Sequence, residues 1–471
     1  MSYKLPLLEE VLKYHNEEKL ILSMPGNKCG RGFRRDRIGQ EFRRRLGDLD
    51  ITEVGNLDNL HHPNGVIEEA QTLLAKTYNA KKAYFLVNGS SSGNLASIFS
   101  AFKEGDEVLV ERNCHKSVYN ALILRKLKVV YIEANIDLEN GILLPCNEKN
   151  IVDALKKCKN PKGIILTTPN YYGISSNLEN ILNMFKANGL KIVIDAAHGA
   201  HYGFSERLPK SMVELAHYIV MSAHKTLPAL TQGAYLLVND NNSNIEFFIS
   251  AFNTTSPSYL IMSSLDYSRY YLDNYAKEDY EKLIDLSEVY TNKINSLDKV
   301  KILSKADITE GYYIDKSRYV MTLPVGFSGS KLFDYLLENS IQSEMSYSRG
   351  VVLILSPFNT REDFEKIYRA IVSLDMEVLR DDKKKIEYKK VNNIKVLDPF
   401  EVHNKKYEEV ELNEAVGRIS KDFVVPYPPG IPMLLPGEKI TEDIIKNIRW
   451  YQGRFISILG IYYNRIKVVI E

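Results

Sequence analysis

The sequence predicts an α/β protein whose large domain is built on a mostly parallel sheet. From about residue 65 onward, short β-rich runs alternate with segments of helical periodicity. Strands that alternate with helices are typical of parallel sheets covered by helices. The polar residues best suited to chemistry follow the ends of these runs. Because such sheets bind ligands beyond the carboxyl ends of their strands, this second observation favours the same architecture.

The expected elements follow in chain order. An amphipathic helix is expected over residues 4–20, then a Gly/Pro-rich loop and a basic, irregular stretch to about residue 65. The next helix is "VIEEAQTLLAKTYN", the first strand is "AYFLVNG", and "NLASIFSAFK" is helical. Further strands are expected at "EVLVER", "KVVYIEA", "GIILTTP", "KIVIDAA", "YIVMSA" and "AYLLV". A long helical pattern covers about residues 266–298.

Four regions are predicted along the chain of 471 residues. They are an N-terminal helix and loop segment (1–65), a large domain (66–298), a small α+β domain (299–380) and a C-terminal domain (381–471). The charged run "RDDKKKIEYKKV" (380–391) is interpreted as a linker. The last region contains "VVPYPPGIPMLLPGE", which is dense in proline and glycine.

Composition excludes several classes of protein. The 61 basic and 60 acidic residues nearly balance, so no nucleic-acid partner is predicted. The four cysteines form no C-x-x-C pair, no metal site is predicted, and a reducing, cytoplasmic compartment is expected. The N-terminus lacks the apolar core of a signal peptide, and no stretch approaches the roughly 20 apolar residues of a membrane span. We therefore expect a soluble intracellular protein without a membrane partner.

The stretch "FLVNGSSSGN" allows two interpretations. Gly89 to Gly93 fit G-x-S-x-G, the turn that carries the nucleophile of serine hydrolases, with Ser91 as the nucleophile. They also fit a phosphate cup at a helix N-terminus, with Ser90 and Ser91 as ligands. A hydrolase would need an oxyanion segment such as HGGG, and none precedes residue 89. The phosphate cup is therefore favoured.

Two strand ends contain the other chemical groups. One ends in Ser222, and His224 and Lys225 follow; a lysine there suits a Schiff-base nucleophile if desolvation keeps its amine partly neutral. The other ends in Asp195, with His198 three residues later. A buried carboxylate needs a partner, and a protonated pyridine nitrogen would be one. The alternatives are an exposed lysine and an aspartate that caps the next turn.

The chain order of phosphate cup, histidine, aspartate and lysine resembles fold-type-I pyridoxal phosphate (PLP) enzymes, the aspartate aminotransferase superfamily. More narrowly, the sequence resembles the Orn/Lys/Arg decarboxylase family in a short form without an N-terminal wing domain. The matching segments extend from about residue 24 to 440: "LDNLHHPNGVIEEAQ", "FLVNGSSSGN", "RNCHKS", "TTPNYYG", "DAAHGAH", "SAHKTLPALTQGA", "TTSPSYLIMSSLD" and "YPPGIPMLLPGE".

The resemblance implies a PLP site with specific roles at its ring. Lys225 would form the Schiff base, and His224 would serve in proton transfer or phosphate contact. Asp195 would hold the pyridine nitrogen, and His198 would lie near the phenolic oxygen. His115, in "RNCHKS", would stack on the ring; a purely structural histidine is the alternative.

The resemblance also implies a phosphate site and a subunit interface. Ser222 would join Ser90 and Ser91 at the phosphate. A neighbouring subunit would reach the same phosphate through Thr254, with the next two residues as alternatives. That contact would place the active site at a subunit interface and make a homodimer, or a higher homo-oligomer, the active unit.

Two positions depart from the family pattern. The family commonly reads "PGHK" where this chain has Asn27 in "PGNK", and Asp-Glu-Ala-His where this chain has Ala196 after Asp195. Neither departure changes Lys225 or Asp195, so cofactor binding is expected to persist. They bear on the identity of the substrate.

The expected activity is decarboxylation of a basic amino acid to CO2 and a polyamine-type amine. Arginine is favoured over lysine and ornithine, and both polyamine synthesis and acid resistance are compatible. Glu438 is a candidate for selecting the substrate's cation. The alternatives are another fold-type-I reaction, such as transamination with Arg349 binding the substrate carboxylate, and a non-catalytic PLP-binding regulator.

Overall fold

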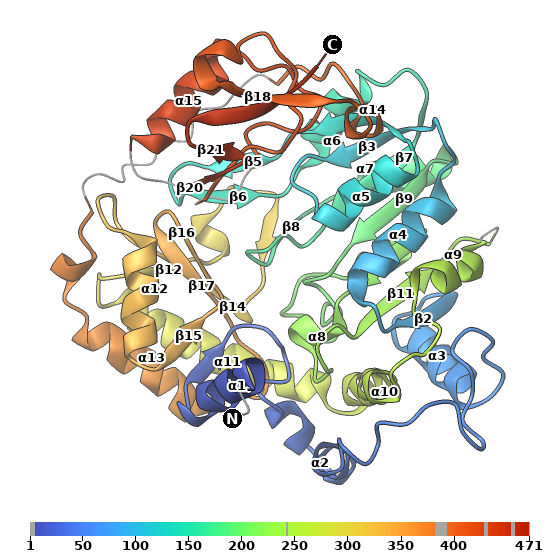
Figure 1. Cartoon of the computed structure of the whole chain (residues 1–471). Coiled ribbons are helices and arrows are strands. Elements are labelled where there is room, and N and C mark those ends of the chain that lie inside the picture. Colours follow the sequence, from blue (N-terminus) through green and yellow to red (C-terminus); the bar gives the residue numbers. More distant parts are fainter. Residues whose placement is uncertain (1–4, 242–243, 382–392, 428–431, 454–456, 471) are drawn as a thin grey trace, which may run out of the picture.

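The computed structural model describes residues 5–241, 244–381, 393–427, 432–453 and 457–470. These residues form a large sheet with helices on both faces, a smaller α+β unit and a C-terminal unit (Figure 1). Within these ranges, no helix has both the length and the apolar character that a bilayer crossing requires.

The large sheet has seven strands in the order β2-β11-β10-β9-β7-β3-β4. Its strands are parallel except β11, which runs antiparallel to both of its neighbours. The bounds are β2 (Lys82–Leu86), β3 (Glu107–Glu111), β4 (Lys128–Ile132), β7 (Pro161–Thr167), β9 (Lys191–Asp195), β10 (Tyr218–Met221) and β11 (Ala234–Val238). All seven predicted strands are confirmed. The central strands are apolar throughout because helices cover both of their faces.

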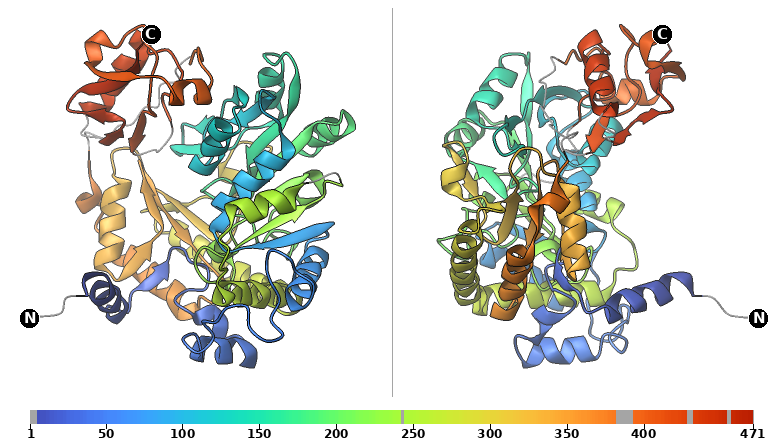
Figure 2. Two further views of the ribbon diagram at one scale, coloured as in Figure 1. Left: turned by 45° about the vertical axis from the view of Figure 1, so that its right-hand side comes forward. Right: turned by 90° about the vertical axis from the view of Figure 1, so that its left-hand side faces the viewer.

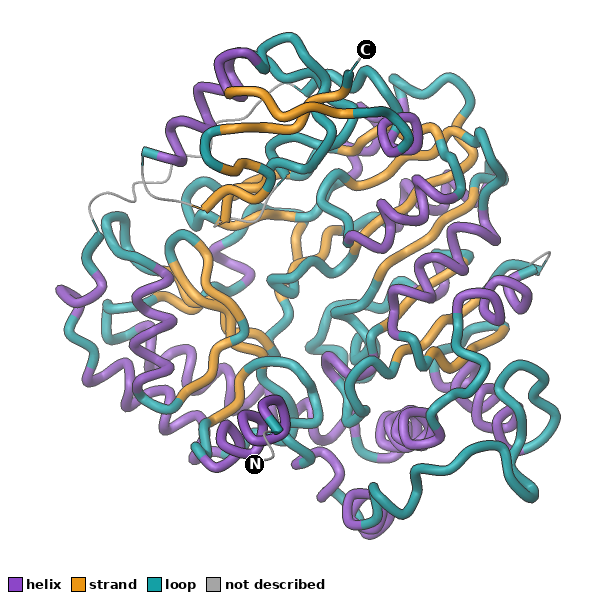
Figure 3. The backbone as a smooth tube through the Cα atoms, viewed as in Figure 1, coloured by secondary structure: helices purple, strands orange, loops and turns teal. Residues whose placement is uncertain are grey.

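Two groups of helices cover the sheet (Figure 3). One face packs against α4 (Gly89–Ala101), α5 (Lys116–Leu124) and α9 (Ile245–Phe252). The other packs against α3 (Val66–Thr77), α6 (Glu148–Leu155), α7 (Glu179–Ala187) and α10 (Tyr259–Asn274). The first turns of α4 and α5 therefore lie at the carboxyl ends of the strands, where the candidate residues gather.

The glycines of "GSSSG" bring α4 close to the sheet. Gly89 has a φ of +77°, a conformation that favours glycine. A Cβ on Gly93 would lie 2.5 Å from a methyl carbon of Leu86 and 2.8 Å from one of Val220. The G-x-S-x-G spacing thus reflects the turn into α4 and its close packing on β2 and β10.

The N-terminal region is more regular than the sequence indicated. Helix α1 spans Pro6–Asn16, and β1 (Leu20–Leu22) pairs in parallel with β15 (Ile341–Ser343). The expectation of an irregular stretch to residue 65 was wrong in part, because α2 spans Arg37–Arg44. Asp36 caps α2 by accepting a hydrogen bond from the backbone N–H of Gly39.

The long helical pattern near residue 270 is two helices. Helix α10 ends at Asn274, and α11 (Ala276–Asn295) begins after Tyr275, whose backbone leaves the helical region. The helical pattern predicted over about residues 266–298 is therefore interrupted at this residue. No proline or glycine marks the break, so the pattern alone gave no signal for it.

The smaller unit holds the antiparallel sheet β12-β14-β17-β16. Its elements are β12 (Lys301–Ile302), β14 (Arg318–Thr322), β16 (Met345–Tyr347), β17 (Gly350–Ile354), α12 (Gly329–Glu338) and α13 (Arg361–Ser373). Strand β13 (Tyr312–Ile314) pairs with β8 (Ile174–Ser176). One apolar core is continuous from the large sheet into this unit. The predicted boundary near residue 298 remains a prediction.

The C-terminal unit has its own apolar core. It contains α14 (Pro399–His403), β18 (Tyr407–Glu411), β19 (Val425–Tyr427), α15 (Glu442–Gln452), β20 (Ser457–Leu459), β21 (Ile461–Tyr462) and β22 (Arg465–Val469). The predicted linker falls almost wholly on residues 382–392, outside the described residues. This unit packs beside the large sheet, while α1 extends from the opposite end of the molecule (Figure 2).

Candidate active site

Lys225 lies in the short helix α8 (Ala223–Thr226), directly after β10. Its Nζ is 3.0 Å from Nε2 of His198. Burial lowers the pKa of Lys225, while the charge of Asp195 acts in the opposite direction. Burial also holds the pKa of His198 well below its ordinary value, helped by the positive charges of Lys225 and Arg318. A neutral imidazole therefore faces an amine that loses its proton more readily than an exposed lysine.

Asp195 is the last residue of β9 and is 3% exposed. Its carboxylate accepts hydrogen bonds from Nδ2 of Asn94, at 2.9 Å, and from the N–H of Ala197, at 3.0 Å. Among the described residues, none forms an ion pair with it. A buried carboxylate without a cationic partner is suited to a positively charged ligand group.

A hydrogen-bonded chain joins His115 to Asp195. Nδ2 of Asn94 also donates to Oγ of Ser117, at 2.9 Å, and that oxygen is 2.8 Å from Nδ1 of His115. His115 is the N-cap of α5 and is exposed. The sequence did not identify Asn94, although it belongs to "GSSSGN". A polar residue at a buried helix position was the available signal.

The first turn of α4 forms an anion site. Oγ of Ser222 donates to Oγ of Ser90 at 2.8 Å, and Ser91 is exposed beside them. No side chain caps α4, so its first N–H groups and its dipole remain available to an anion. Among the described residues, no histidine bonds to Ser91, so the nucleophile interpretation has no structural support.

His224 and Thr254 lie at the edge of this arrangement. Nδ1 of His224 is 3.0 Å from the carbonyl oxygen of Gly233, and burial lowers its pKa. Thr254 is half-buried in the loop between α9 and α10, and its carbonyl oxygen is 2.8 Å from Nε2 of His61. The structure contains one chain, so the phosphate contact from a second subunit remains a prediction.

Three further residues near Lys225 were not predicted from the sequence, because they do not lie directly at the ends of the predicted strands. Arg318 is fully buried, and its Nη2 is 3.4 Å from Nδ1 of His198. The ring of Tyr171 packs on His198, with centroids 4.7 Å apart. The Tyr171 hydroxyl donates to Glu344, a half-buried carboxylate between β15 and β16. These contacts are long-range, and no local pattern encodes them.

The two family departures have structural explanations. Nδ2 of Asn27 donates to the carbonyl of Ala229 at 2.8 Å, and its Oδ1 accepts from the N–H of Gly30 at 2.9 Å. Asn27 thus fixes the N-terminal loop to the segment after Lys225. Ala196 is buried, and its N–H bonds to the carbonyl of Val220. Neither residue disturbs Asp195 or Lys225.

Two residues suggested for substrate binding are engaged elsewhere. Both carboxylate oxygens of Glu438 pair with Arg112, at 2.5 and 2.7 Å, and the glutamate is 1% exposed. Arg349 donates to the backbone carbonyls of Leu323 and Glu139. Within one chain, therefore, neither side chain is available to a substrate, and the transaminase alternative gains no support from Arg349.

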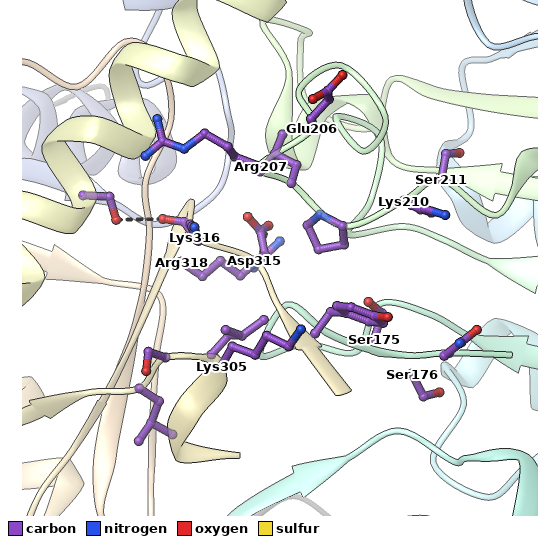
Figure 4. A pocket seen from close by; sticks show the side chains of 18 of the residues that line it. Ser175, Ser176, Glu206, Arg207, Lys210, Ser211, Lys305, Asp315, Lys316 and Arg318 are labelled. Atoms are coloured by element: carbon purple, nitrogen blue, oxygen red, sulfur yellow. Dashed lines mark hydrogen bonds and ion pairs between the residues drawn. The ribbon is translucent and has the colours of Figure 1, made fainter. Parts of the chain in front are cut away.

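A cavity of about 940 Å³ adjoins Arg318 but does not include Lys225. Figure 4 shows Asp315 and Arg318 among the residues that line this cavity, between Arg207 and Lys305. Asp315 accepts a hydrogen bond from His201 at 2.9 Å. Burial acts to raise the pKa of Asp315, but His201, Arg318 and Ser317 together lower it to about 2. The charges of Asp315 and Arg318 at this cavity are thus largely compensated by each other and by His201.

The residues present fit PLP. An uncapped helix N-terminus with Ser90 and Ser222 suits the phosphate, and the buried, unpaired Asp195 suits a protonated ring nitrogen. Lys225 offers an amine with a lowered pKa. All these groups lie at the carboxyl edge of one sheet.

This fold and site define a fold-type-I PLP enzyme architecture. Solved structures with the same fold include lysine decarboxylase LdcF of Francisella novicida, with a TM-score of 0.77 and 19% identity, covering 98% of this chain and 83% of that chain. Serine palmitoyltransferase of Sphingomonas wittichii gives a TM-score of 0.56 and 15% identity, covering 78% of this chain and 96% of that chain.

The chain belongs to the Orn/Lys/Arg decarboxylase family. The model of the major domain of this family matches residues 5–324, and that of its C-terminal domain matches residues 394–454. "Uncharacterized protein YaaO" of Bacillus subtilis (strain 168) is 34% identical, covering 98% of this chain and 96% of that protein. "Arginine decarboxylase" of Bacillus anthracis is 30% identical, covering 95% and 93%. Members of this family are PLP-dependent amino-acid decarboxylases.

Proposed function

We propose that this protein is a PLP-dependent decarboxylase of a basic amino acid, with arginine as the preferred substrate. The observation that carries the proposal is the occurrence of three features at one site. They are Lys225, whose pKa is lowered, the buried Asp195, which forms no ion pair with the described residues, and the uncapped N-terminus of α4. Membership of the Orn/Lys/Arg decarboxylase family supports the reaction class. Relatives named arginine decarboxylase, at 30% identity, support the substrate.

In the proposed mechanism, PLP supplies the electron sink that accepts the electron pair left when the substrate carboxylate departs as CO2. Lys225 provides an amine that loses its proton more readily than an exposed lysine, because burial lowers its pKa. Asp195 offers its carboxylate to the ring nitrogen, and Asn94 fixes the orientation of that carboxylate. Ser90, Ser222 and the first turn of α4 hold the phosphate.

A proton must replace the lost carboxylate on the substrate Cα. The bond from Cα to the carboxylate breaks and a Cα–H bond forms, so each turnover consumes one proton. Nζ of Lys225 and the imidazole of His224 are the proposed proton carriers. Nε2 of His198, held neutral and 3.0 Å from Nζ of Lys225, can accept a hydrogen bond from that amine and orient it.

We also propose a homodimer with the active site at the subunit interface. Helix α1 supports this proposal, since it buries none of its residues in the single chain. Its apolar side chains are exposed, Leu7 at 79% and Leu12 at 54%. Sedimentation of the full chain measures the assembly, and Leu7→Lys with Leu12→Lys is expected to weaken it.

The test of the function is release of CO2 from carboxyl-labelled arginine, lysine and ornithine by the purified protein with PLP. Release from arginine, absent in Lys225→Ala, is the expected result. A keto-acid product without CO2 would favour transamination instead. If no substrate yields either product, the decarboxylase proposal is wrong.

A further inference from the structure

Two carboxylates act electrostatically on Lys225, and only one has a role in the proposed function. The negative charges of Asp195 and Glu344 both raise the pKa of Lys225 against the effect of burial. Asp195 serves the cofactor ring. Glu344 belongs to the smaller unit, where it lies between β15 and β16.

The backbone around Glu344 fixes its position. The residue lies between β15 and β16, and its N–H donates to the carbonyl of Val352 at 3.0 Å. Strand β1 pairs with β15 so that Leu22 is opposite Ser343. This pairing brings the N–H of Met24 to 2.9 Å from Oε2 of Glu344. The N-terminal region, through Met24, and the smaller unit thus both fix this carboxylate where the two regions meet.

Side-chain contacts connect Glu344 to the reactive amine. Oε1 of Glu344 accepts a hydrogen bond from the hydroxyl of Tyr171. The ring of Tyr171 packs on His198, and His198 lies 3.0 Å from Nζ of Lys225. Glu344 is therefore connected, through the side chains of Tyr171 and His198, to the amine at which a substrate would react.

Glu344 retains capacity to bind a cation. Among the described residues, no lysine, arginine or histidine forms an ion pair with it, and its two hydrogen bonds come from a hydroxyl and a backbone N–H. Each oxygen uses one of its two acceptor positions, so one position on each oxygen remains. Two acceptors on one carboxylate match the two parallel N–H donors of a guanidinium group.

We propose that Glu344 is the specificity-determining residue that binds the cationic end of the substrate, and that its two remaining acceptor positions favour guanidinium over ammonium. This inference rests on the proposed function. It replaces Glu438, whose carboxylate is taken by Arg112 within the chain. Arginine gains two charged hydrogen bonds at Glu344, whereas the ammonium of lysine or ornithine lacks two parallel N–H donors in one plane.

Glu344→Gln is a suitable test because it removes the charge and keeps the contacts. The amide oxygen can accept from Met24, and the amide nitrogen can donate to the hydroxyl of Tyr171. Glu338→Gln is the matched control, since Glu338 is exposed at the end of α12 in the same unit. Thermal unfolding of all three proteins confirms that they are folded.

The first readout compares arginine with citrulline, a neutral analogue of the same shape. In the wild-type enzyme, kcat/KM for CO2 release should favour arginine strongly. In Glu344→Gln this preference should fall by about 10- to 100-fold, mainly through KM, because a charged hydrogen bond is lost. Glu338→Gln should retain the wild-type preference.

The second readout does not require turnover. The charge of Glu344 raises the pKa of Lys225, so its removal lowers that pKa. PLP uptake by the apoprotein depends on the neutral amine, and its midpoint in pH should therefore move to lower pH in Glu344→Gln. An unchanged midpoint would show that the charge of Glu344 does not reach Lys225, and would contradict its placement beside the reactive amine.

The outcomes separate the two proposals. An active wild type with an unchanged preference in Glu344→Gln would overturn the role of Glu344 and leave the decarboxylase function intact. A wild type that prefers lysine or ornithine would overturn the guanidinium arrangement. A wild type inactive on all three amino acids would overturn the proposed function and this inference with it.

Discussion

At the scale of single residues, burial gives this site its reactivity. Lys225 is half-buried, next to a histidine that burial keeps neutral. Desolvation disfavours the ammonium form of Lys225, and only part of this effect is offset by Asp195 and Glu344. The fold thus favours loss of the proton from this amine, and the residues that act on Lys225 come from distant parts of the chain.

This arrangement predicts the pH dependence of cofactor uptake. Schiff-base formation requires the neutral amine, so the rate of PLP uptake by the apoprotein should rise with pH until the pH exceeds the pKa of Lys225. Because that pKa is lowered from its ordinary value of 10.5, the rate should level off at a lower pH. Stopped-flow absorbance measures the rate. A rate that continues to rise up to pH 10.5 would contradict the lowered pKa.

The residue scale also shows what the sequence could predict. Asp195 ends a strand, and Ser90 and Lys225 lie shortly after one. Because a parallel sheet brings strand ends together, local pattern and architecture were sufficient to find these three residues. Arg318 and Glu344 come from the smaller unit. Their approach to the site depends on how two units pack, which no spacing along the chain expresses.

At the scale of elements, the position of α4 decides whether the anion site exists. Its N-terminal turn must lie close to the strand ends, and Gly93 permits this approach to Leu86 and Val220. The strand direction of β11 and the break at Tyr275 were not encoded in hydrophobic pattern. The hydrophobic pattern determines which side chains are buried. The direction of a strand and the break in a helix depend instead on the connecting loops and on tertiary packing.

Gly93→Ala is predicted to destabilise the protein and weaken PLP binding. A Cβ at 2.8 Å from a Val220 methyl carbon forces α4 away from the sheet. Overpacking of this kind costs about 1–3 kcal/mol, and the displaced helix carries Ser90 away from Ser222. Urea unfolding and PLP titration measure the two effects. Gly453→Ala, whose Cβ would meet nothing closer than 3.4 Å, is the control and should be near neutral.

At the scale of the whole molecule, a buried ion pair joins the C-terminal unit to the large sheet. Arg112 follows β3, Glu438 precedes α15, and their side chains are 6% and 1% exposed. Glu438 also accepts a hydrogen bond from the N–H of Leu435 at 2.8 Å. A carboxylate buried this deeply depends on its partner for stability.

Arg112→Met is therefore predicted to loosen the C-terminal unit by about 3–5 kcal/mol, because it leaves Glu438 buried without a cation. The single tryptophan, Trp450, lies in α15, so its fluorescence during urea unfolding reports on this unit. The double variant Arg112→Met/Glu438→Met should recover most of the loss. Equal destabilisation in both variants would show that packing, and not the unpaired charge, is responsible.

The most direct test of the central claim is to locate the lysine that binds PLP. The holoenzyme is reduced with borohydride and digested, and the pyridoxyl-labelled peptide is identified by mass spectrometry. We expect a single labelled site at Lys225, and no label in Lys225→Ala. A label on another lysine, or none on the wild type, would contradict the site described here.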